Sequence, residues 1–162
     1  MKTTMRVLLV GAAGGYAAGK VMDRATTWFY QHQSDASKQR EGQLLPEGAP
    51  MASARKLARL VGVEPTEEQA GQLASVLHQS LGQLYGVGAA SLTRAGVPPL
   101  AAGITTGVAG LLLVDELANS LFFTPPPQAY PVESHLRGLV GHLSFGVTLG
   151  VVLAVARRLR LL

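Results

Sequence analysis

Gly138–Ala156 reads GLVGHLSFGVTLGVVLAVA and Ala95–Val114 reads AGVPPLAAGITTGVAGLLLV, and neither stretch contains Lys, Arg, Asp or Glu. Gln69–Thr93 is also free of charged residues. Each stretch is close to the roughly 20 residues that an α-helix needs to cross a bilayer. A charge at the bilayer centre costs about 2.5–3.5 kcal/mol on insertion scales, so stretches without charge predict membrane-spanning helices. We therefore expect an all-α integral membrane bundle.

The composition agrees with a membrane protein. Of the 162 residues, 48% are hydrophobic and 15% are charged, whereas about 25% of the residues in soluble domains are charged. The length fits a single domain, residues 1–162. The chain contains no cysteine, which excludes a disulfide framework, a thiolate metal site and a cysteine nucleophile. Its net charge of +4 comes from cations at predicted helix ends and in one loop. We therefore expect contacts with lipid headgroups and no nucleic-acid site.

Prolines and capping residues divide the chain into four predicted spans. Pro65 and the capping box Thr66–Gln69 start one helix. Pro98–Pro99 starts the next helix, and Thr124–Pro127 separates it from the last one. The predicted transmembrane helices cover residues 6–30, 67–93, 98–123 and 131–156.

Residues 31–66 are expected to form a long polar first loop. Polar residues, proline and glycine dominate from Gln31 to Pro50, which is typical of a mobile connection. Met51–Val61 then places apolar and basic residues on opposite sides of a short amphipathic helix. Such a helix lies either on the membrane surface or against the bundle as an ordinary linker helix.

The first span is the most ambiguous segment. Gly14-x4-Gly19-Lys20 matches most of a phosphate-binding loop, but Val21 stands where a Ser or Thr would hold magnesium. A cleaved signal peptide and the core helix of a soluble protein are further alternatives. We favour a first membrane helix that is anchored at the interface by Trp28–Tyr30.

Glycines at intervals of four residues are predicted to let the helices pack closely. The predicted helix-packing positions are Gly11, Gly15, Gly19, Gly82, Gly86, Gly103, Gly107, Gly138, Gly146 and Gly150. Glycine faces of this kind would suit contacts between copies of the chain, or contacts with other subunits of a larger membrane complex.

The distribution of charge predicts that both termini lie in the cytoplasm. With four spans, the termini and the turn at Arg94 share one side, which holds cations and no acids in short segments. These cations are Lys2, Arg6, Arg94, Arg157, Arg158 and Arg160. Near the opposite side, Asp23 is expected to pair with a neighbouring cation.

Ionisable residues inside the spans form the candidate site. His78 and His142 lie at similar depth in two helices that start from the same side. Asp115 and Glu116 return toward that side in the antiparallel helix between them, so we expect all four side chains to converge in one buried layer. His135 is predicted to be a solvated residue near the end of its helix.

Four roles of this layer are compatible with the sequence. We favour a structural cluster in which His78 and His142 hydrogen-bond Asp115 or Glu116 and fix the helix register. A proton relay, a divalent metal site and a bis-histidine haem site are the alternatives. No cofactor is expected in the favoured interpretation. Because no GxSxG elbow or other hydrolytic motif is present, we do not expect an enzyme.

The order of short motifs resembles the YagU family of bacterial inner-membrane proteins. The motifs are Val21–Thr27, Arg40–Glu41, Ala54–Ala58, Val76–Gly82, Leu84–Gly86, Asp115–Glu116, Tyr130–Pro131, His135 and Gly141–His142. The resemblance implies a multi-spanning inner-membrane protein without assigned enzymatic activity, loosely connected with acid tolerance. It assigns no catalytic residue, and Gln79 stands where the family usually has an aromatic residue.

The expected function is therefore non-enzymatic. The chain would be either a small proton-responsive protein of the inner membrane or an accessory subunit of a larger membrane complex. The alternative is an electron-transfer subunit that binds haem or a metal through His78 and His142.

Overall fold

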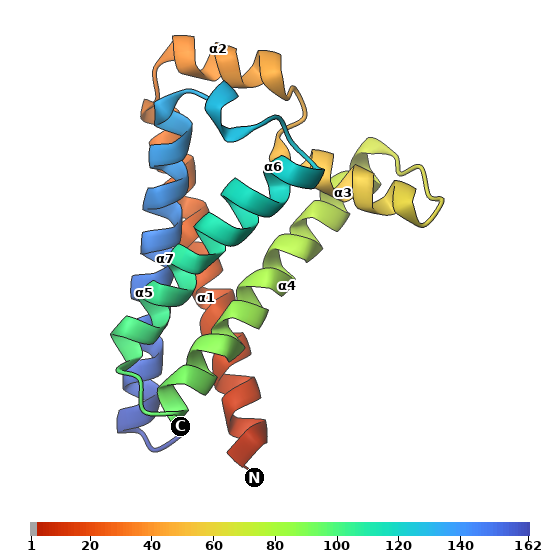
Figure 1. The fold of residues 1–162 in the computed structure, drawn as a ribbon. Helices are drawn as coiled ribbons and strands as arrows, with labels where there is room; N and C mark the ends of the chain where they lie inside the picture. Colours follow the sequence, from red (N-terminus) through yellow and green to blue (C-terminus); the bar gives the residue numbers. More distant parts are fainter. Residues whose placement is uncertain (1–2) are drawn as a thin grey trace.

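The computed structural model of the chain describes residues 3–162, and its secondary structure is entirely helical in this part of the chain (Figure 1). The long helices are α1 (Thr3–His32), α4 (Glu67–Arg94) and α7 (Val132–Arg158). Between α4 and α7, α5 (Pro99–Gly110) continues into the π-helix η1 (Leu111–Ala118) and then into α6 (Asn119–Phe122). The expected all-α fold class is thus confirmed.

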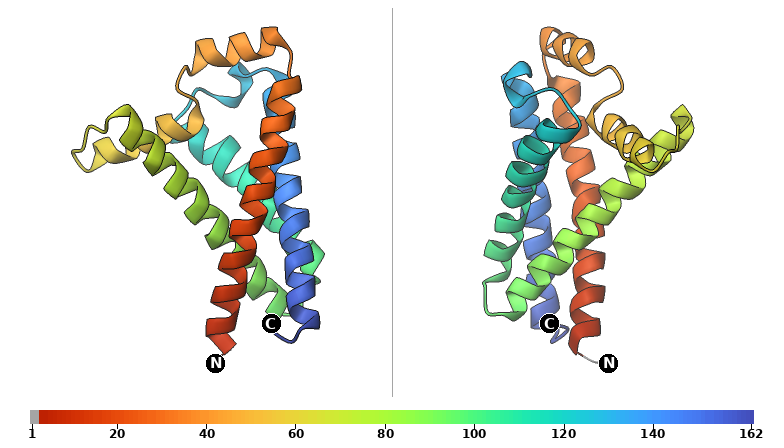
Figure 2. Two further views of the ribbon diagram at one scale, coloured as in Figure 1. Left: turned by 180° about the vertical axis from the view of Figure 1, so that it is seen from behind. Right: turned by 45° about the vertical axis from the view of Figure 1, so that its right-hand side comes forward.

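Helices α1, α4, α5 and α7 alternate in direction along the chain and form a bundle (Figure 1). Helix α1 packs against both α4 and α7, and α5 packs against α7. Both termini and the turn between α4 and α5 lie at one end of the bundle, as Figures 1 and 2 show. Helix α4 leans away from α1 and α7 toward the opposite end (Figure 2). This divergence leaves space between the helices at that end.

Thr66 begins α4 as the sequence predicts. Its hydroxyl accepts a hydrogen bond from the Gln69 backbone N–H, and the Gln69 side chain accepts one from the Thr66 backbone N–H. The capping box thereby satisfies two N–H groups that the first turn of a helix leaves without partners.

The segment predicted to be a polar loop with one short helix at Met51–Val61 contains two helices, and the predicted helix is confirmed as α3 (Ala49–Leu60). Helix α2 (Asp35–Leu44) occupies residues for which the polar composition predicted a mobile connection, and that prediction of a loop is wrong for α2. Ser34 caps α2 through a hydrogen bond from the Ser37 backbone N–H, and Asp35 in the first turn complements the positive helix end. Helix α3 packs against α4. A short 3₁₀ turn, η2 (Pro127–Ala129), precedes α7.

Glycines lie where the helices approach most closely. Gly11 and Gly15 of α1 face the backbone of α4 around Gly82 and Gly86. A methyl group on Gly15 would collide with the carbonyl oxygen of Gly82. The same kind of contact joins Gly103 and Gly107 of α5 to Gly146 and Gly150 of α7. Not every predicted position packs in this way, since a methyl group on Gly19 would meet nothing within 4 Å.

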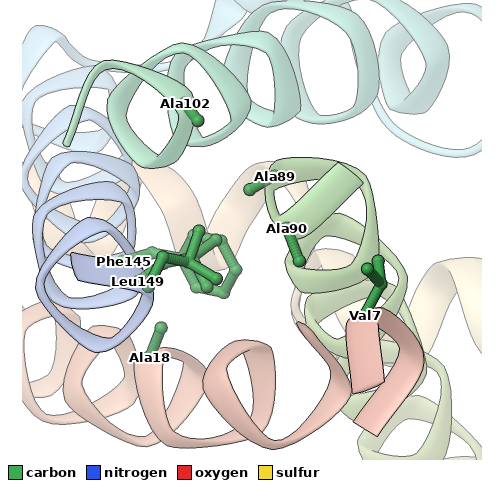
Figure 3. Packing of buried hydrophobic residues seen from close by; sticks show 8 residues of the cluster. Val7, Ala18, Ala89, Ala90, Ala102, Phe145 and Leu149 are labelled. Atoms are coloured by element: carbon green, nitrogen blue, oxygen red, sulfur yellow. The ribbon is translucent and has the colours of Figure 1, made fainter. Parts of the chain in front are cut away.

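Small residues fill most of the core, and large apolar residues cover much of the outside. The central cluster in Figure 3 contains Val7, Ala18, Ala89, Ala90, Ala102, Phe145, Leu149 and Leu153. Large apolar side chains on the outer faces are exposed, including Leu84, Leu112, Leu113, Leu121, Phe122, Val132 and Val151. Soluble proteins usually bury residues of this kind.

Two helical segments have the length and hydropathy of a membrane span among residues 3–162, namely Pro99–Phe122 and Val132–Arg158. Helices α1 and α4 do not reach the same hydropathy. Lys20, Asp23 and Arg24 interrupt α1, and α4 begins with Glu67 and Glu68 and contains several glutamines. Apolar helices of this length also occur in the cores of soluble proteins, so the structure shows two candidate spans where the sequence analysis expected four.

Candidate functional site

A cavity of 590 Å³ lies between the diverging helices. Its lining comes from α1, α3, α4, η1, α6 and α7. The walls are mainly apolar and aromatic, with Met22, Leu57, Leu77, Leu81, Tyr85, Leu111, Val114, Phe123, Tyr130 and Phe145. All four of the predicted site residues, His78, Asp115, Glu116 and His142, line this cavity.

Three histidine–carboxylate pairs belong to this region of the described chain. His142 Nε2 lies 2.9 Å from Asp115 Oδ2, which joins α7 to η1. This is the pairing that the sequence analysis expected for His142. His78 Nε2 lies 2.9 Å from Asp23 Oδ1 and so joins α4 to α1. The prediction that His78 pairs with Asp115 or Glu116 is therefore wrong.

The third pair consists of His135 and Glu116. His135 Nδ1 lies 2.9 Å from Glu116 Oε1, and His135 Nε2 lies 3.1 Å from the carbonyl oxygen of Pro127. His135 lies in the first turn of α7 and its side chain is 37% exposed, in line with the prediction of a helix-end residue. It is not merely solvated, however, since both of its ring nitrogens have partners and it lines the cavity. One sequence signal could have added His135 to the candidate site, because it shares a helical face with His142.

The two partners of His135 limit the hydrogen bonds that its ring can make. A backbone carbonyl and an ionised carboxylate can only accept hydrogen bonds. A neutral imidazole has one N–H, so it can donate either to Glu116 or to the Pro127 carbonyl. It donates to both only when it is doubly protonated.

His142 has a different environment. Its side chain is 6% exposed, whereas that of Asp115 is 45% exposed. Gly110 leaves space for the imidazole, because a Cβ there would lie 3.2 Å from His142 Nδ1 and 3.0 Å from Tyr85 Cε2. Among the described residues, His142 Nδ1 has no hydrogen-bond partner, so a neutral ring that donates from Nε2 satisfies this site.

The π-helix supplies both carboxylates that face α7. Asp115 and Glu116 are consecutive residues of η1, and they bind His142 and His135, which lie two turns apart on α7. The wider turn of a π-helix alters the direction of each side chain compared with an α-helix, and such segments often occur at functional sites. The sequence predicts an uninterrupted α-helix here, so the π-helical segment was not expected.

A second polar cluster closes the end of the bundle near the cavity. Arg137 Nη2 lies 2.9 Å from Glu41 Oε2, and Arg137 Nη1 donates to Gln33 Oε1 at 2.8 Å. Burial raises the pKa of Glu41, but hydrogen bonds from Ser134, Arg137 and Gln33 outweigh it and hold the pKa below the ordinary value. This cluster links α2 to α7. It was not predicted from the sequence, because the residues of α2 were expected to lie in a loop.

No group of at least three His, Asp or Glu side chains in residues 3–162 is arranged to hold a metal ion. Nε2 of both His78 and His142 faces a carboxylate oxygen. Ligation of a haem or metal through these nitrogens would first have to break both hydrogen bonds. The cofactor alternative stays a prediction.

The fold and site define the chain as a helical protein with two apolar helices compatible with membrane association and a cavity bordered by histidine–carboxylate pairs. Comparisons with family models, with curated proteins and with solved structures find no match. The resemblance to the YagU family stays a prediction.

Proposed function

We propose that the chain is a non-enzymatic, multi-spanning protein of the bacterial inner membrane whose cavity responds to protons. The large apolar side chains on the outer faces and the small residues between helices support this location, because membrane helices pack through small residues and face lipid with large ones. In this proposal α1 and α4 cross the bilayer together with α5–α6 and α7, against which they pack.

The cytoplasm is the proposed side for both termini. Arg6, Arg94, Arg157 and Arg158 belong to the end of the bundle that carries the termini (Figure 1). Arg6 donates to the carbonyl oxygen of Arg160, so the first and last helices are linked at this end. Short segments rich in Arg and Lys favour the cytoplasmic side.

The three histidine–carboxylate pairs around one cavity carry the proposal of a proton response. Imidazoles ordinarily change charge between roughly pH 5 and 8. The pairs connect α1 with α4 and η1 with α7, so a change in their charge acts on the contacts that hold the cavity walls together.

His142 determines which conformation acidification favours. A second proton on its ring would go to Nδ1, which lies near Gly110 and has no acceptor among the described residues, in a side chain that is 6% exposed. A buried N–H without an acceptor costs about 1–3 kcal/mol. Acidification therefore favours a conformation in which the imidazole moves toward water or toward a new acceptor. Because His142 is bonded to η1, this movement changes the separation of the cavity walls.

Distance measurements between spin labels test the proposal, since the absence of cysteine allows two labels to be placed without removing any residue. Val76→Cys on α4 and Leu136→Cys on α7 are exposed positions on two helices that line the cavity. In nanodiscs, we expect the distance distribution to change between about pH 8 and pH 5.

The variant with His78→Gln, His135→Gln and His142→Gln should lose this change. His32→Gln should keep it, because His32 bonds a backbone carbonyl of its own helix and does not line the cavity. A distance distribution that ignores pH, or an unchanged response in the triple variant, would contradict the proposal.

A further inference from the structure

We infer that the cavity binds a hydrophobic organic cation, with the positive charge of the ligand beside Asp115. This inference names the ligand class of the site proposed above to respond to protons, and it rests on that proposed function.

The cavity suits an organic molecule rather than a small ion. Its volume of 590 Å³ falls within the range of about 300–1,000 Å³ that small-molecule sites occupy. Aromatic rings from three parts of the chain line it, namely Tyr85, Phe123, Tyr130 and Phe145, and the Tyr85 and Phe145 rings meet edge to face. Aromatic faces attract organic cations, and more strongly when water is excluded.

The charges facing the cavity leave the two carboxylates of η1, Asp115 and Glu116, without a Lys or Arg partner among the described residues. Arg137 of α7 is neutralised by Glu41 of α2. Glu116 pairs with His135 of α7.

On α1 and α4, Asp23 beside His78 is compensated by Lys20, whose Nζ lies 3.8 Å from Asp23 Oδ2. No charged residue of α3 or α6 lines the cavity. Asp115 is paired only with His142, so its carboxylate adds negative charge to a largely apolar cavity.

Unused polar atoms mark the place where a ligand would bind. Asp115 Oδ2 accepts from His142, whereas Asp115 Oδ1 accepts no hydrogen bond from the described residues. The Tyr85 hydroxyl is buried without any partner, and Tyr85 lies beside His142 at Gly110. A buried hydroxyl without a partner is unfavourable. A cation with N–H groups, or a polar group attached to it, would satisfy both atoms.

Protons compete with such a ligand. When His142 becomes protonated, the Asp115–His142 pair loses its net charge and with it the attraction for a cation. The cavity should therefore bind the cation at about pH 8 and release it at about pH 5. The groups that titrate around it are His78, Asp23, Glu116, His135 and Glu41, together with Asp115 and His142 themselves.

Two ions of equal shape and opposite charge test the inference. Tetraphenylphosphonium and tetraphenylborate both partition into detergent and lipid, so the difference between them isolates the charge of a protein site. We expect saturable binding of tetraphenylphosphonium by the full chain, measured by calorimetry at about pH 8. Tetraphenylborate should show no saturable binding.

Asp115→Asn should weaken binding of the cation about tenfold, the scale of one screened charge pair. Asp115→Glu retains the charge and should bind within about threefold of the original chain. Glu67→Gln removes an acid that does not line the cavity and should leave the affinity unchanged. Equal affinity for both ions, or equal affinity of Asp115→Asn, would overturn the inference.

The outcome also separates this inference from the proposed function. If the spin-label distances respond to pH but no cation binds, the ligand class is wrong and the proton response stands. If the cation binds and the distances ignore pH, the proposed function fails while the binding site remains.

Discussion

Glu116 Oε1 lies 2.9 Å from His135 Nδ1, while the opposite nitrogen of the same ring faces the Pro127 carbonyl oxygen at 3.1 Å. Both partners of the imidazole are acceptors, so a neutral ring can donate to only one of them. The pair differs from the Asp115–His142 pair two turns further along α7, where the ring is satisfied by a single N–H.

Glu116→Gln should fix His135 in the tautomer that carries its proton on Nε2, without breaking its contacts. The amide of Gln can donate to Nδ1, so the ring then needs only the N–H that it donates to Pro127. We expect His135 to be a neutral imidazole in this variant at neutral pH, as measured by histidine ¹⁵N chemical shifts. Glu133→Gln, which changes an acid bonded to Ser34, should leave the His135 shifts unaltered.

Gly15→Ala and Gly19→Ala should have opposite effects on stability, although both glycines lie on α1. The methyl group on Gly15 meets the Gly82 carbonyl, whereas that on Gly19 meets nothing within 4 Å. Overpacking costs about 1–3 kcal/mol, whereas Gly→Ala in an open helix position gains about 0.5–1 kcal/mol. Unfolding in mixed micelles measures both. Equal stabilities would show that the α1–α4 contact differs from the one described.

The Glu41 cluster should make stability depend on pH in the acidic range. Because the pKa of Glu41 lies below its ordinary value of 4.5 in the folded chain, the carboxylate stabilises the fold above that value. The contribution disappears as pH falls through the lower folded-state pKa. The melting temperature should therefore decline below about pH 4.5, and Glu41→Gln should reduce that decline. An identical pH profile for Glu41→Gln would contradict this role.

Single cysteines should settle how many helices cross the bilayer. Gly42→Cys in α2 and Gly96→Cys in the α4–α5 turn lie at opposite ends of the bundle. If α4 spans the membrane, a membrane-impermeant thiol reagent added to intact spheroplasts should label Gly42→Cys and not Gly96→Cys. Equal labelling of the two positions would show that α4 does not cross.

A visible spectrum separates the proton-responsive site from the cofactor alternative. Protein purified from membranes in mild detergent should be colourless, with no band in the reduced-minus-oxidised spectrum and no stoichiometric metal. A Soret band that disappears in His78→Leu and in His142→Leu would assign the cavity to haem and electron transfer instead.

Much of the helical framework could be predicted from local sequence. The capping box at Thr66 and the prolines at Pro98–Pro99 and Pro131 locate the helix starts to within one residue. Helix α2 could not be predicted from composition, since its polar residues resemble those of a loop. Ser34 followed by Asp35 was the local signal for its start.

The part of the site that depends on a single pair of neighbouring helices could be predicted from the sequence. Asp115 follows α5 in η1, and this segment runs antiparallel to α7, so Asp115 and His142 lie at the same depth in the bundle. Their pairing could therefore be predicted from depth alone. His78 could not be assigned to Asp23, because that contact depends on the angle at which α4 crosses α1. The His135–Glu116 pair depends on the π-helical turn of η1, which no propensity in the sequence predicts.

The histidine ¹⁵N spectrum of the unaltered chain in nanodiscs, recorded at about pH 8, tests the central claim most directly. The proposed site predicts that the His142 ring carries a single proton, on Nε2. On acidification to about pH 5, His142 should gain its second proton together with the change in spin-label distance. A His142 that is already doubly protonated at pH 8, or one that does not titrate in this range, would contradict the account.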